Sequence, residues 1–171
     1  MNKAAEDRCD EHLHRTGTGI VAIDSSREPT RPARLGDFAC AILIDTLGRF
    51  LLQQRDDIPG ILYPGKVGLF GGHREGDESY LQCVIREIHE EIGYFVMPEQ
   101  FHYFLAYEGI VDVTGATAYG EIFIARDISV SDLAITEGSL LIVASDGIAE
   151  IEPKLSPSAH LALTTFLGGK V

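Results

Sequence analysis

The spacing of apolar and polar residues along this chain predicts strands in its first half and a strong helix near its centre. A continuous apolar run at Phe38–Ile44 is long enough for a buried strand, and residues 50–55 read as its antiparallel partner across the polar turn 45–49. A shorter apolar segment, 67–70, ends at Gly71-Gly72. The remaining predicted elements are strands at 101–107, 120–125 and 140–144 and a closing helix at about 158–167, capped by Ser156 or Ser158.

The strongest local signal is an amphipathic helix between Ser79 and Ile92. Ser79 and Gln82 have the spacing of a capping box, and Gly93 stands where a left-handed C-terminal cap is expected. Apolar residues recur at three- and four-residue steps and form one face of this helix: Leu81, Val84, Ile85, Ile88 and Ile92. Because strands alternate with helices, the pattern predicts a mixed α/β domain.

Composition narrows the classes of partner. The chain has 171 residues, 45% of them apolar, which is enough for one buried core. Its net charge of −12 repels phosphate backbones and anionic lipid, so long nucleic acid and membranes are disfavoured as partners. Three separated cysteines (Cys9, Cys40 and Cys83) and no apolar leader in the first ten residues favour a reducing compartment. We therefore expect a soluble, cytoplasmic protein.

Residues 1–36 differ in character from the rest of the chain. Six basic and six acidic residues cancel there, so the whole negative charge lies in residues 37–171. Prolines and glycines interrupt the segment, and its only apolar run is residues 20–23. We predict a loosely ordered N-terminal lead-in over residues 1–36, with at most one short strand, followed by a single domain over residues 37–171.

Three glutamates on the predicted helix suggest chemistry. Glu87, Glu90 and Glu91 are spaced i, i+3 and i+4, so their carboxylates can converge to within about 6 Å. A solvated acidic face is one interpretation. The other is a cation site, because desolvated carboxylates about 5 Å apart repel by roughly 3 kcal/mol per pair and a hard divalent cation removes that cost. Oxygen ligands of this kind select Mg²⁺, Mn²⁺ or Ca²⁺ over zinc.

The residues around this cluster match a longer pattern. Gly72 is followed after five residues by Glu78, and after seven more by the run Arg86-Glu87-Ile88-His89-Glu90-Glu91-Ile92-Gly93. This segment resembles the Nudix box at all seven of its defining positions and departs from it at Tyr94, where the box has a small aliphatic residue. A hairpin before the box and a Glu137-Gly138 pair ahead of a strand and a final helix extend the resemblance.

The resemblance implies a fold and an activity. The fold is a Nudix-type α/β/α sandwich with a mixed, curved β-sheet. The activity is that of a Mg²⁺-dependent pyrophosphohydrolase, with Mn²⁺ as an alternative cation. It cleaves the diphosphate bond of a nucleoside diphosphate linked to another moiety, in a nucleotide, nucleotide sugar or modified nucleoside triphosphate, by water attack on phosphorus. Two alternatives stay open: a non-catalytic nucleotide-binding or regulatory module, and a diphosphate-isoprenoid isomerase. Many relatives form homodimers, which the sequence leaves undecided.

The resemblance also implies the roles of the reactive residues. Glu87 and Glu91 are expected as principal metal ligands, Glu90 as a third ligand or water holder, and the carbonyl of Gly71 as a further ligand. The general base is either one of these box glutamates or Glu137, which sits at the Glu-Gly step. Weaker candidates for the base are Glu108, Asp112 and Glu121.

The other residues of interest have supporting roles. Arg55, at the end of the second predicted strand, is a candidate phosphate contact. Gly72, Glu78, Arg86 and Gly93 are expected as scaffold within the motif. Arg86 is further expected to lie away from the carboxylate face of the helix.

Overall fold

The computed structural model describes residues 36–111 and 114–168. The strands are β1 (Phe38–Asp45), β2 (Phe50–Gln54), β3 (Val67–Gly68), β4 (Phe70–His73), β5 (His102–Val111), β6 (Ala116–Ile128) and β7 (Ser139–Val143), and the α-helices are α1 (Tyr80–Ile92), α2 (Ile148–Ile151) and α3 (Pro157–Phe166). The predicted lead-in apart from Gly36, its short strand at 20–23, and Asp112 lie outside the described residues, so the domain boundary stays a prediction.

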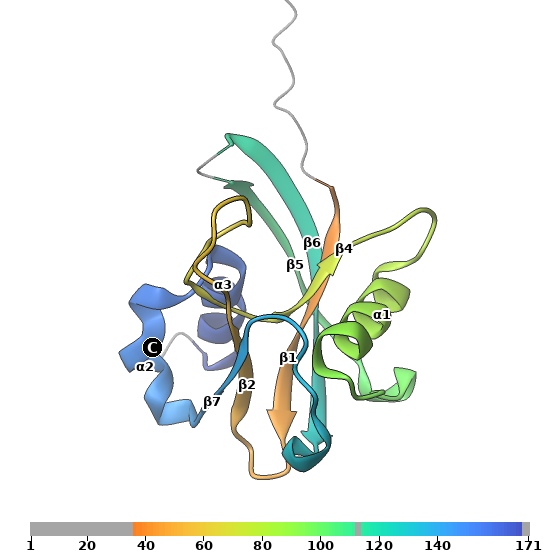
Figure 1. Ribbon diagram of the computed structural model, residues 1–171, viewed down its shortest axis with the longest axis vertical. Helices are drawn as coiled ribbons and strands as arrows, with labels where there is room; N and C mark the ends of the chain where they lie inside the picture. Colours follow the sequence, from red (N-terminus) through yellow and green to blue (C-terminus); the bar gives the residue numbers. More distant parts are fainter. Residues whose placement is uncertain (1–35, 112–113, 169–171) are drawn as a thin grey trace, which may run out of the picture. The chain divides into compact units, whose positions relative to one another are not determined.

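Among the described residues, seven strands form one mixed sheet around β1 (Figure 1). One side of β1 pairs in parallel with β6, which pairs in turn with β5. The other side has two antiparallel partners in succession: β4 pairs with residues Phe38–Ala41, and β2 pairs with Leu43 and Ile44. β2 also pairs with β3 and β7. Because β1 exchanges one neighbour for another, β2 and β4 diverge, and the candidate site lies at this divergence.

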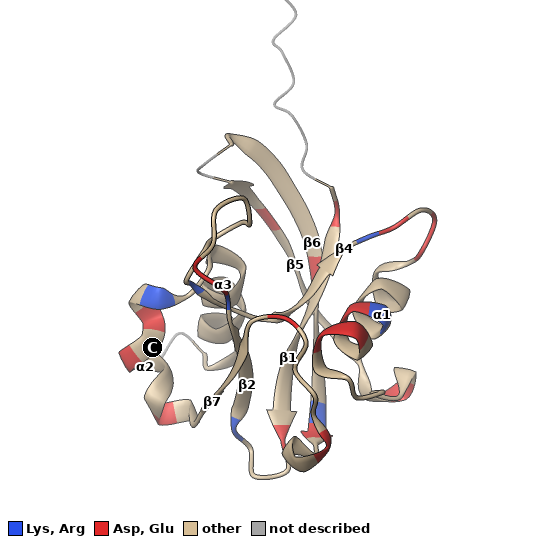
Figure 2. Cartoon of the chain, viewed as in Figure 1, with Lys and Arg blue, Asp and Glu red and all other residues tan. Residues whose placement is uncertain are grey.

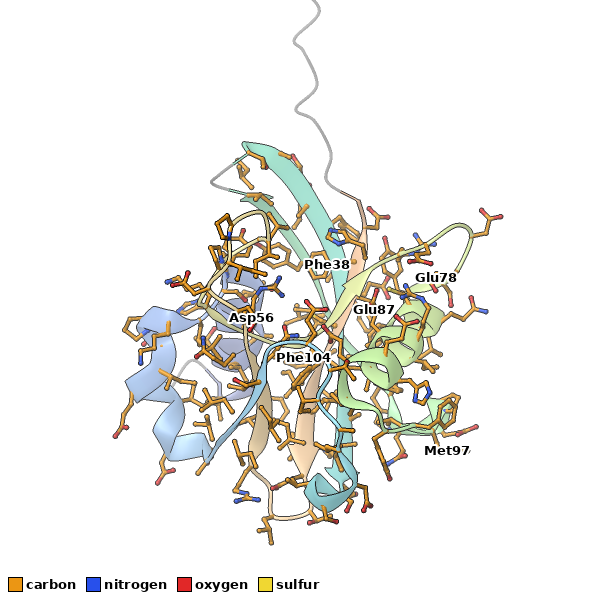
Figure 3. The ribbon with its side chains drawn as sticks, viewed as in Figure 1. Phe38, Asp56, Glu78, Glu87, Met97 and Phe104 are labelled. Atoms are coloured by element: carbon orange, nitrogen blue, oxygen red, sulfur yellow. The ribbon has the colours of Figure 1, made fainter. Side chains whose placement is uncertain are left out.

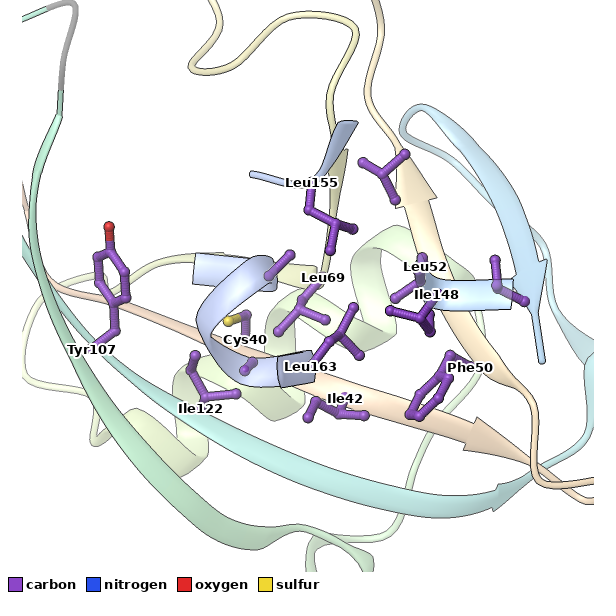
Figure 4. Close-up of a cluster of buried hydrophobic side chains, with 14 of the residues drawn as sticks. Cys40, Ile42, Phe50, Leu52, Leu69, Tyr107, Ile122, Ile148, Leu155 and Leu163 are labelled. Atoms are coloured by element: carbon purple, nitrogen blue, oxygen red, sulfur yellow. The ribbon is translucent and has the colours of Figure 1, made fainter. Parts of the chain in front are cut away.

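Alternation along β1 builds the two faces of the sheet. Ala39, Ala41 and Leu43 face α1 in one buried cluster, whereas Cys40, Ile42 and Ile44 face α3 in a second. Figure 4 shows part of the second cluster, in which Leu163 of α3 lies near Ile42 and Ile148 of α2 lies near Leu52. Figure 1 shows α1 on one side of the sheet and α2 and α3 on the other. The predicted α/β/α sandwich with a mixed sheet is therefore confirmed.

The helix α1 has the caps that its sequence predicts. The Ser79 side chain accepts a hydrogen bond from the backbone N–H of Gln82, and the Gln82 side chain accepts one from the backbone N–H of Ser79. Gly93 ends the helix at φ 62°, and its N–H donates to the carbonyl of His89. Local signals alone thus fix both ends of the element that carries the acidic cluster.

Long-range pairing alters other predicted bounds. The segment predicted as one strand at 67–70 is two strands, because Leu69 crosses from the β2 edge to the β1 edge. The strand predicted at 120–125 is only the middle of β6, which extends to residues 116–128 as it pairs with β5 and β1. The closing helix begins at Pro157 with Ser156 as its N-cap residue, and α2 was not predicted.

Within residues 36–111 and 114–168, no helix is long and apolar enough to cross a membrane. Acidic positions are spread over several elements, and on α1 they surround one basic position, Arg86 (Figure 2). That arrangement shapes the electrostatics of the site described below.

Asp45 is expected to stabilise the β1–β2 turn in a pH-dependent way. Its buried carboxylate accepts hydrogen bonds from the N–H groups of Leu47 and Arg49 and pairs with the Arg49 guanidinium at 2.6 Å. Burial alone would raise the pKa of Asp45, but the bonds from Arg49 and Leu47 outweigh it and lower the pKa. Asp45→Ala should therefore cost about 1–3 kcal/mol of unfolding free energy at pH 7.

The sign of the shift gives the pH window. A lowered folded-state pKa stabilises the protein above the unfolded-state value, near 3.9, and this contribution is lost as the pH falls through the folded-state pKa. Denaturant titrations should show the difference between wild type and Asp45→Ala shrinking below that pH, whereas the exposed-residue control Asp146→Ala should differ little from wild type throughout. An Asp45→Ala cost that is the same at pH 7 and pH 3 would contradict this account.

Candidate active site

A cavity of about 380 Å³ opens where β2 and β4 diverge beside β1. Its wall combines acidic, glycine and apolar residues from both halves of the fold. The carboxylates are Glu75, Glu87, Glu91 and Glu137, the glycines are Gly68, Gly71 and Gly72, and the remaining lining residues are Phe38, Cys40, Arg55, Leu62, Tyr63, Leu69, His73, Tyr107, Val111, Ala118, Ser156 and Ser158. Six predicted site residues (Arg55, Gly71, Gly72, Glu87, Glu91 and Glu137) thus share one cavity.

Two glycines let β4 pack closely against its neighbours, Gly71 against β1 and Gly72 against α1. Gly71 has φ +136°, a conformation that L residues rarely adopt, and a Cβ there would lie 2.2 Å from the carbonyl oxygen of Ala39. At Gly72 a Cβ would lie 2.4–2.5 Å from the carboxyl atoms of Glu87. Figure 3 shows Glu87 on the side of α1 that faces β4. Gly72 therefore makes room for the Glu87 carboxylate against the sheet, and Gly71 lets β4 lie close to β1.

Glu91 is a buried carboxylate held at both oxygens. It is only 5% exposed, yet it lines the cavity. Its Oε2 accepts a hydrogen bond of 2.7 Å from the N–H of Gly71, and its Oε1 accepts one of 3.0 Å from Nε2 of Gln53. Burial raises the pKa of Glu91 to about 7, and the charges of Glu137 and Glu87 act in the same direction, whereas the two hydrogen bonds oppose the rise.

Glu87 lies one helical turn before Glu91 and is paired with Arg86. Burial raises its pKa, and the Arg86 guanidinium partly offsets that rise. Nη1 of Arg86 lies 2.9 Å from Glu87 Oε1 and 3.2 Å from Glu90 Oε2. The prediction that Arg86 lies away from the carboxylate face is therefore wrong. Its Cβ points elsewhere on the helix, but the long side chain reaches back over the turn.

Arg86 also braces the loop before the helix, which agrees with its expected scaffold role. Its Nη2 lies 2.7 Å from Glu78 Oε1, and Glu78 accepts a further bond from the N–H of Glu75. The hydrogen bonds from Arg86 lower the pKa of Glu78 to about 2. Arg74 donates to the backbone carbonyl of Glu78, so the loop from β4 to α1 is held by charged side chains at several points.

Glu90 differs from its two neighbours in the cluster. Its side chain is 58% exposed, points to Arg86, and does not line the cavity. Across residues 36–111 and 114–168, no three Asp, Glu, His or Cys side chains stand together as a ready metal site. The predicted convergence of three carboxylates is thus not assembled. Glu87 and Glu91 come together at the cavity, and Glu90 would have to leave Arg86 to join them.

Glu137 reaches the cavity because its loop is bonded to the end of α1. The N–H of Thr136 donates to the carbonyl of Glu91, and its hydroxyl donates to the carbonyl of Glu90. Gly138 follows at φ +65°, where a Cβ would lie 2.5 Å from the carbonyl oxygen of Gln54. The Glu-Gly step therefore turns the chain tightly into β7 and leaves the side chain of Glu137 at the cavity wall.

The remaining candidates are placed less centrally. Arg55 lines the cavity, where its Nε donates to the carbonyl of Leu62 and its Nη1 donates to Gln53 Oε1 at 3.3 Å. Glu108 is exposed on β5, and Glu121 lies half-buried on β6; neither lines the cavity. Sequence reasoning missed Gln53, which looks like an ordinary polar strand residue until its partner Glu91 is known.

The carboxylates of this cavity suit a hard divalent cation. Glu87 and Glu91 supply oxygen ligands. Burial raises the pKa of both carboxyl groups, so ionising either one costs free energy that its hydrogen bonds and neighbouring charges do not fully offset. A bound cation would lower both values. Beside them, the Gly71-Gly72 backbone leaves space that a Cβ would fill. The donor set is all oxygen, which fits Mg²⁺ or Mn²⁺ better than zinc.

Comparison with known proteins agrees with this geometry. The family model described as NUDIX domain matches residues 35–138. An uncharacterized Nudix hydrolase of Yersinia pestis is 34% identical over 84 residues, which are 48% of this chain and 46% of that protein. The alignment therefore spans about half the length of that curated relative.

Solved structures show the same fold at lower identity. The MutT protein from Methanosarcina mazei Go1 superposes with a TM-score of 0.66 at 21% identity, over 80% of this chain and 94% of that one. A NUDIX hydrolase from Nitrosomonas europaea gives a TM-score of 0.64 at 19% identity, over 79% and 90% of the two chains.

The chain belongs to the Nudix family, since the domain model covers more than half of it. The predicted family is thereby confirmed. Membership also supports the expected enzyme class, a hydrolase of phosphoric anhydride bonds.

Proposed function

We propose that this protein is a Mg²⁺-dependent pyrophosphohydrolase that cleaves the diphosphate bond of a nucleoside diphosphate linked to another moiety. The observation that carries the proposal is the meeting of Glu87, Glu91 and Glu137 at one cavity beside the Gly71-Gly72 backbone. Hydrolysis of a diphosphate requires charge neutralisation, a positioned water and a base, and this cavity offers oxygen ligands and a separate carboxylate.

The cation would be held by Glu87 and Glu91, with the carbonyl of Gly71 and the carboxylate of Glu90 as further donors. When bound, Mg²⁺ or Mn²⁺ neutralises the diphosphate and lowers the pKa of a water molecule. Arg86 pairs with both Glu87 and Glu90. It therefore limits the negative charge of the cluster, and Glu90 would have to leave this pairing to reach the cation.

Glu137 is the residue that we propose as general base. It comes from the β6–β7 loop rather than from α1, lines the same cavity, and interacts electrostatically with Glu91. In the reaction, the oxygen of water attacks phosphorus, its proton passes to the Glu137 carboxylate, and the bond from phosphorus to the bridging oxygen breaks. Arg55, which lines the cavity, is the residue that we propose to contact a phosphate oxygen.

The apolar wall of the cavity suits a nucleobase. Phe38 and Tyr107 pack with ring centroids 5.8 Å apart, and Leu62, Tyr63 and Val111 line the same cavity. Aromatic and aliphatic side chains of this kind bind the faces of planar rings. We propose small substrates, namely nucleotides, nucleotide sugars or modified nucleoside triphosphates.

The two alternative functions find less support. A binding module that has lost catalysis needs no intact set of box glutamates, yet Glu87, Glu90 and Glu91 are all present. An isomerase needs a reactive cysteine. Burial strongly raises the pKa of the Cys40 thiol and raises that of Cys83 to about 12, so neither is a ready thiolate.

A substrate panel tests the proposal directly. Purified protein is incubated with nucleoside triphosphates, nucleotide sugars, dinucleotides and oxidised nucleotides, with Mg²⁺, with Mn²⁺ and with chelator, and products are separated by chromatography. We expect one class to be cleaved at its diphosphate only when the cation is present. Reaction in ¹⁸O-labelled water should place the label on a phosphate product. Tight nucleotide binding without cleavage of any compound would instead favour the binding module.

A further inference from the structure

Two of the buried polar side chains in this fold contact each other beside the cavity. Among the described residues, the buried polar or charged side chains are Asp45, Gln53, Glu91 and Ser156. Gln53, on β2, is 1% exposed, and its Nε2 lies 3.0 Å from Glu91 Oε1. A buried amide costs free energy unless it is hydrogen-bonded, so a glutamine at this position calls for an explanation.

The surrounding hydrogen bonds fix the direction in which this amide points. Nη1 of Arg55 donates to Gln53 Oε1 at 3.3 Å, which leaves the NH₂ end of the amide facing Glu91. A flipped amide would oppose its oxygen to a carboxylate and its NH₂ group to a guanidinium. Arg55 therefore determines which end of the Gln53 amide faces Glu91.

The same NH₂ group also reaches the loop of the proposed base. Gln53 Nε2 lies 3.3 Å from the backbone carbonyl oxygen of Glu137. Gln53 stands opposite Leu140 in the β2–β7 pairing, only a few residues along the chain from Glu137. One side chain thus ties together the helix carboxylate and the backbone from which the second carboxylate extends.

A neutral donor has a specific advantage at this position. Glu91 receives one hydrogen bond on each oxygen, from Gly71 and from Gln53, so its rotation is restricted while its negative charge is not cancelled. A lysine or arginine would hold the carboxylate equally well but would compete with a cation for it. Glu87 has such a cationic partner in Arg86, whereas no basic side chain among the described residues forms an ion pair with Glu91.

We propose that Gln53 is a positioning residue that holds the Glu91 carboxylate ready for a divalent cation. This inference rests on the proposed function, since it takes Glu91 as a cation ligand. Loss of a residue that orients a metal ligand typically weakens metal affinity 10- to 100-fold. Gln53→Met keeps the volume of the side chain and removes the hydrogen bonds, so the dissociation constant for Mn²⁺ should rise about tenfold or more.

The test measures binding of Mn²⁺ alone, by electron paramagnetic resonance of the free ion, without substrate. Gln54→Met is the matched control: Gln54 is the next residue of β2, and its amide donates to the carbonyl of Gly65 instead. Gln53→Asn retains an amide that is too short to reach Glu91, and it provides a second variant if the methionine one does not fold. Thermal unfolding establishes that each variant is folded.

The expected pattern is weaker Mn²⁺ binding in Gln53→Met and Gln53→Asn, and near-native binding in Gln54→Met even where its thermal midpoint falls. Cation titration of turnover should show the same rise in the activation constant. Native Mn²⁺ affinity in both Gln53 variants, with binding abolished in Glu91→Gln, would overturn the positioning role and leave the proposed function intact. Absence of Mn²⁺ binding by the wild-type protein would overturn both.

Discussion

Glu91→Gln is expected to lower kcat/KM by about 10³-fold or more while the protein remains folded. The substitution keeps the shape of the side chain and removes the charge that would hold a cation. A cation supplies several kcal/mol of transition-state stabilisation, and about 4 kcal/mol corresponds to a factor of 10³ in rate. Steady-state kinetics on the substrate identified by the panel measure the effect.

The same variant has a second expected property that a general loss of structure would not produce. Burial raises the pKa of Glu91 to about 7, so ionisation of Glu91 destabilises the cation-free protein above that pH. In Glu91→Gln the charge is removed, but the new NH₂ group faces one of the two donors, Gly71 N–H or Gln53 Nε2. The two effects oppose each other, so the unfolding temperature at pH 8 without cation should stay close to the wild-type value. Added Mg²⁺ or Mn²⁺ should stabilise wild type by linkage and leave the variant unchanged.

Glu150→Gln serves as the matched control, because it makes the same chemical change at an exposed position of α2 outside the cavity. It should retain native kinetics and the native response to cation. Near-native turnover in Glu91→Gln would remove the basis for the cation site. Loss of turnover with a much lower unfolding temperature would mean that Glu91 acts through the fold.

The parts of this molecule that the sequence predicts well are those set by local physics. The helix α1 is predicted to the residue at both caps, because its capping box, apolar spacing and terminal glycine all lie within about one turn of the backbone that they affect. The motif around it singles out Glu87 and Glu91 as the expected principal metal ligands, and both side chains line the cavity. The meeting of these residues with Glu137 follows from a family pattern, and hydrogen bonds to the end of α1 give it a physical cause.

The features that the sequence does not predict depend on partners far along the chain. The apolar run 67–70 becomes two strands on either side of Leu69, because the residues before Leu69 pair with β2 and the residues after it pair with β1. A helical projection gives the direction of the Arg86 Cβ but not the reach of its guanidinium, which returns to Glu87 and Glu90. Gln53 acquires its role only from Glu91, 38 residues away. A pattern of residues near Gln53 in the sequence therefore cannot predict its contact with Glu91.

The two adjacent glycines of β4 should separate stability from function when each is changed to alanine. At Gly72 the three atoms nearest to the added Cβ all belong to the carboxyl group of Glu87, the far end of a flexible side chain that can move aside. Gly72→Ala should therefore fold with a small change in unfolding temperature, yet lower kcat/KM by about 100-fold, because outer positions that displace a metal ligand have effects of this size.

At Gly71 the added Cβ would meet backbone atoms of β1 instead: the carbonyl oxygen of Ala39 at 2.2 Å and the Cα of Cys40 at 2.4 Å. Backbone paired in a sheet cannot move aside cheaply, and φ +136° adds strain for any L side chain. Gly71→Ala should thus cost about 4 kcal/mol or more of unfolding free energy. Denaturant titration and kinetics on both variants decide the matter: a stable but inactive Gly71→Ala, or an active Gly72→Ala, would show that β4 does not set the position of Glu87 in the way this geometry requires.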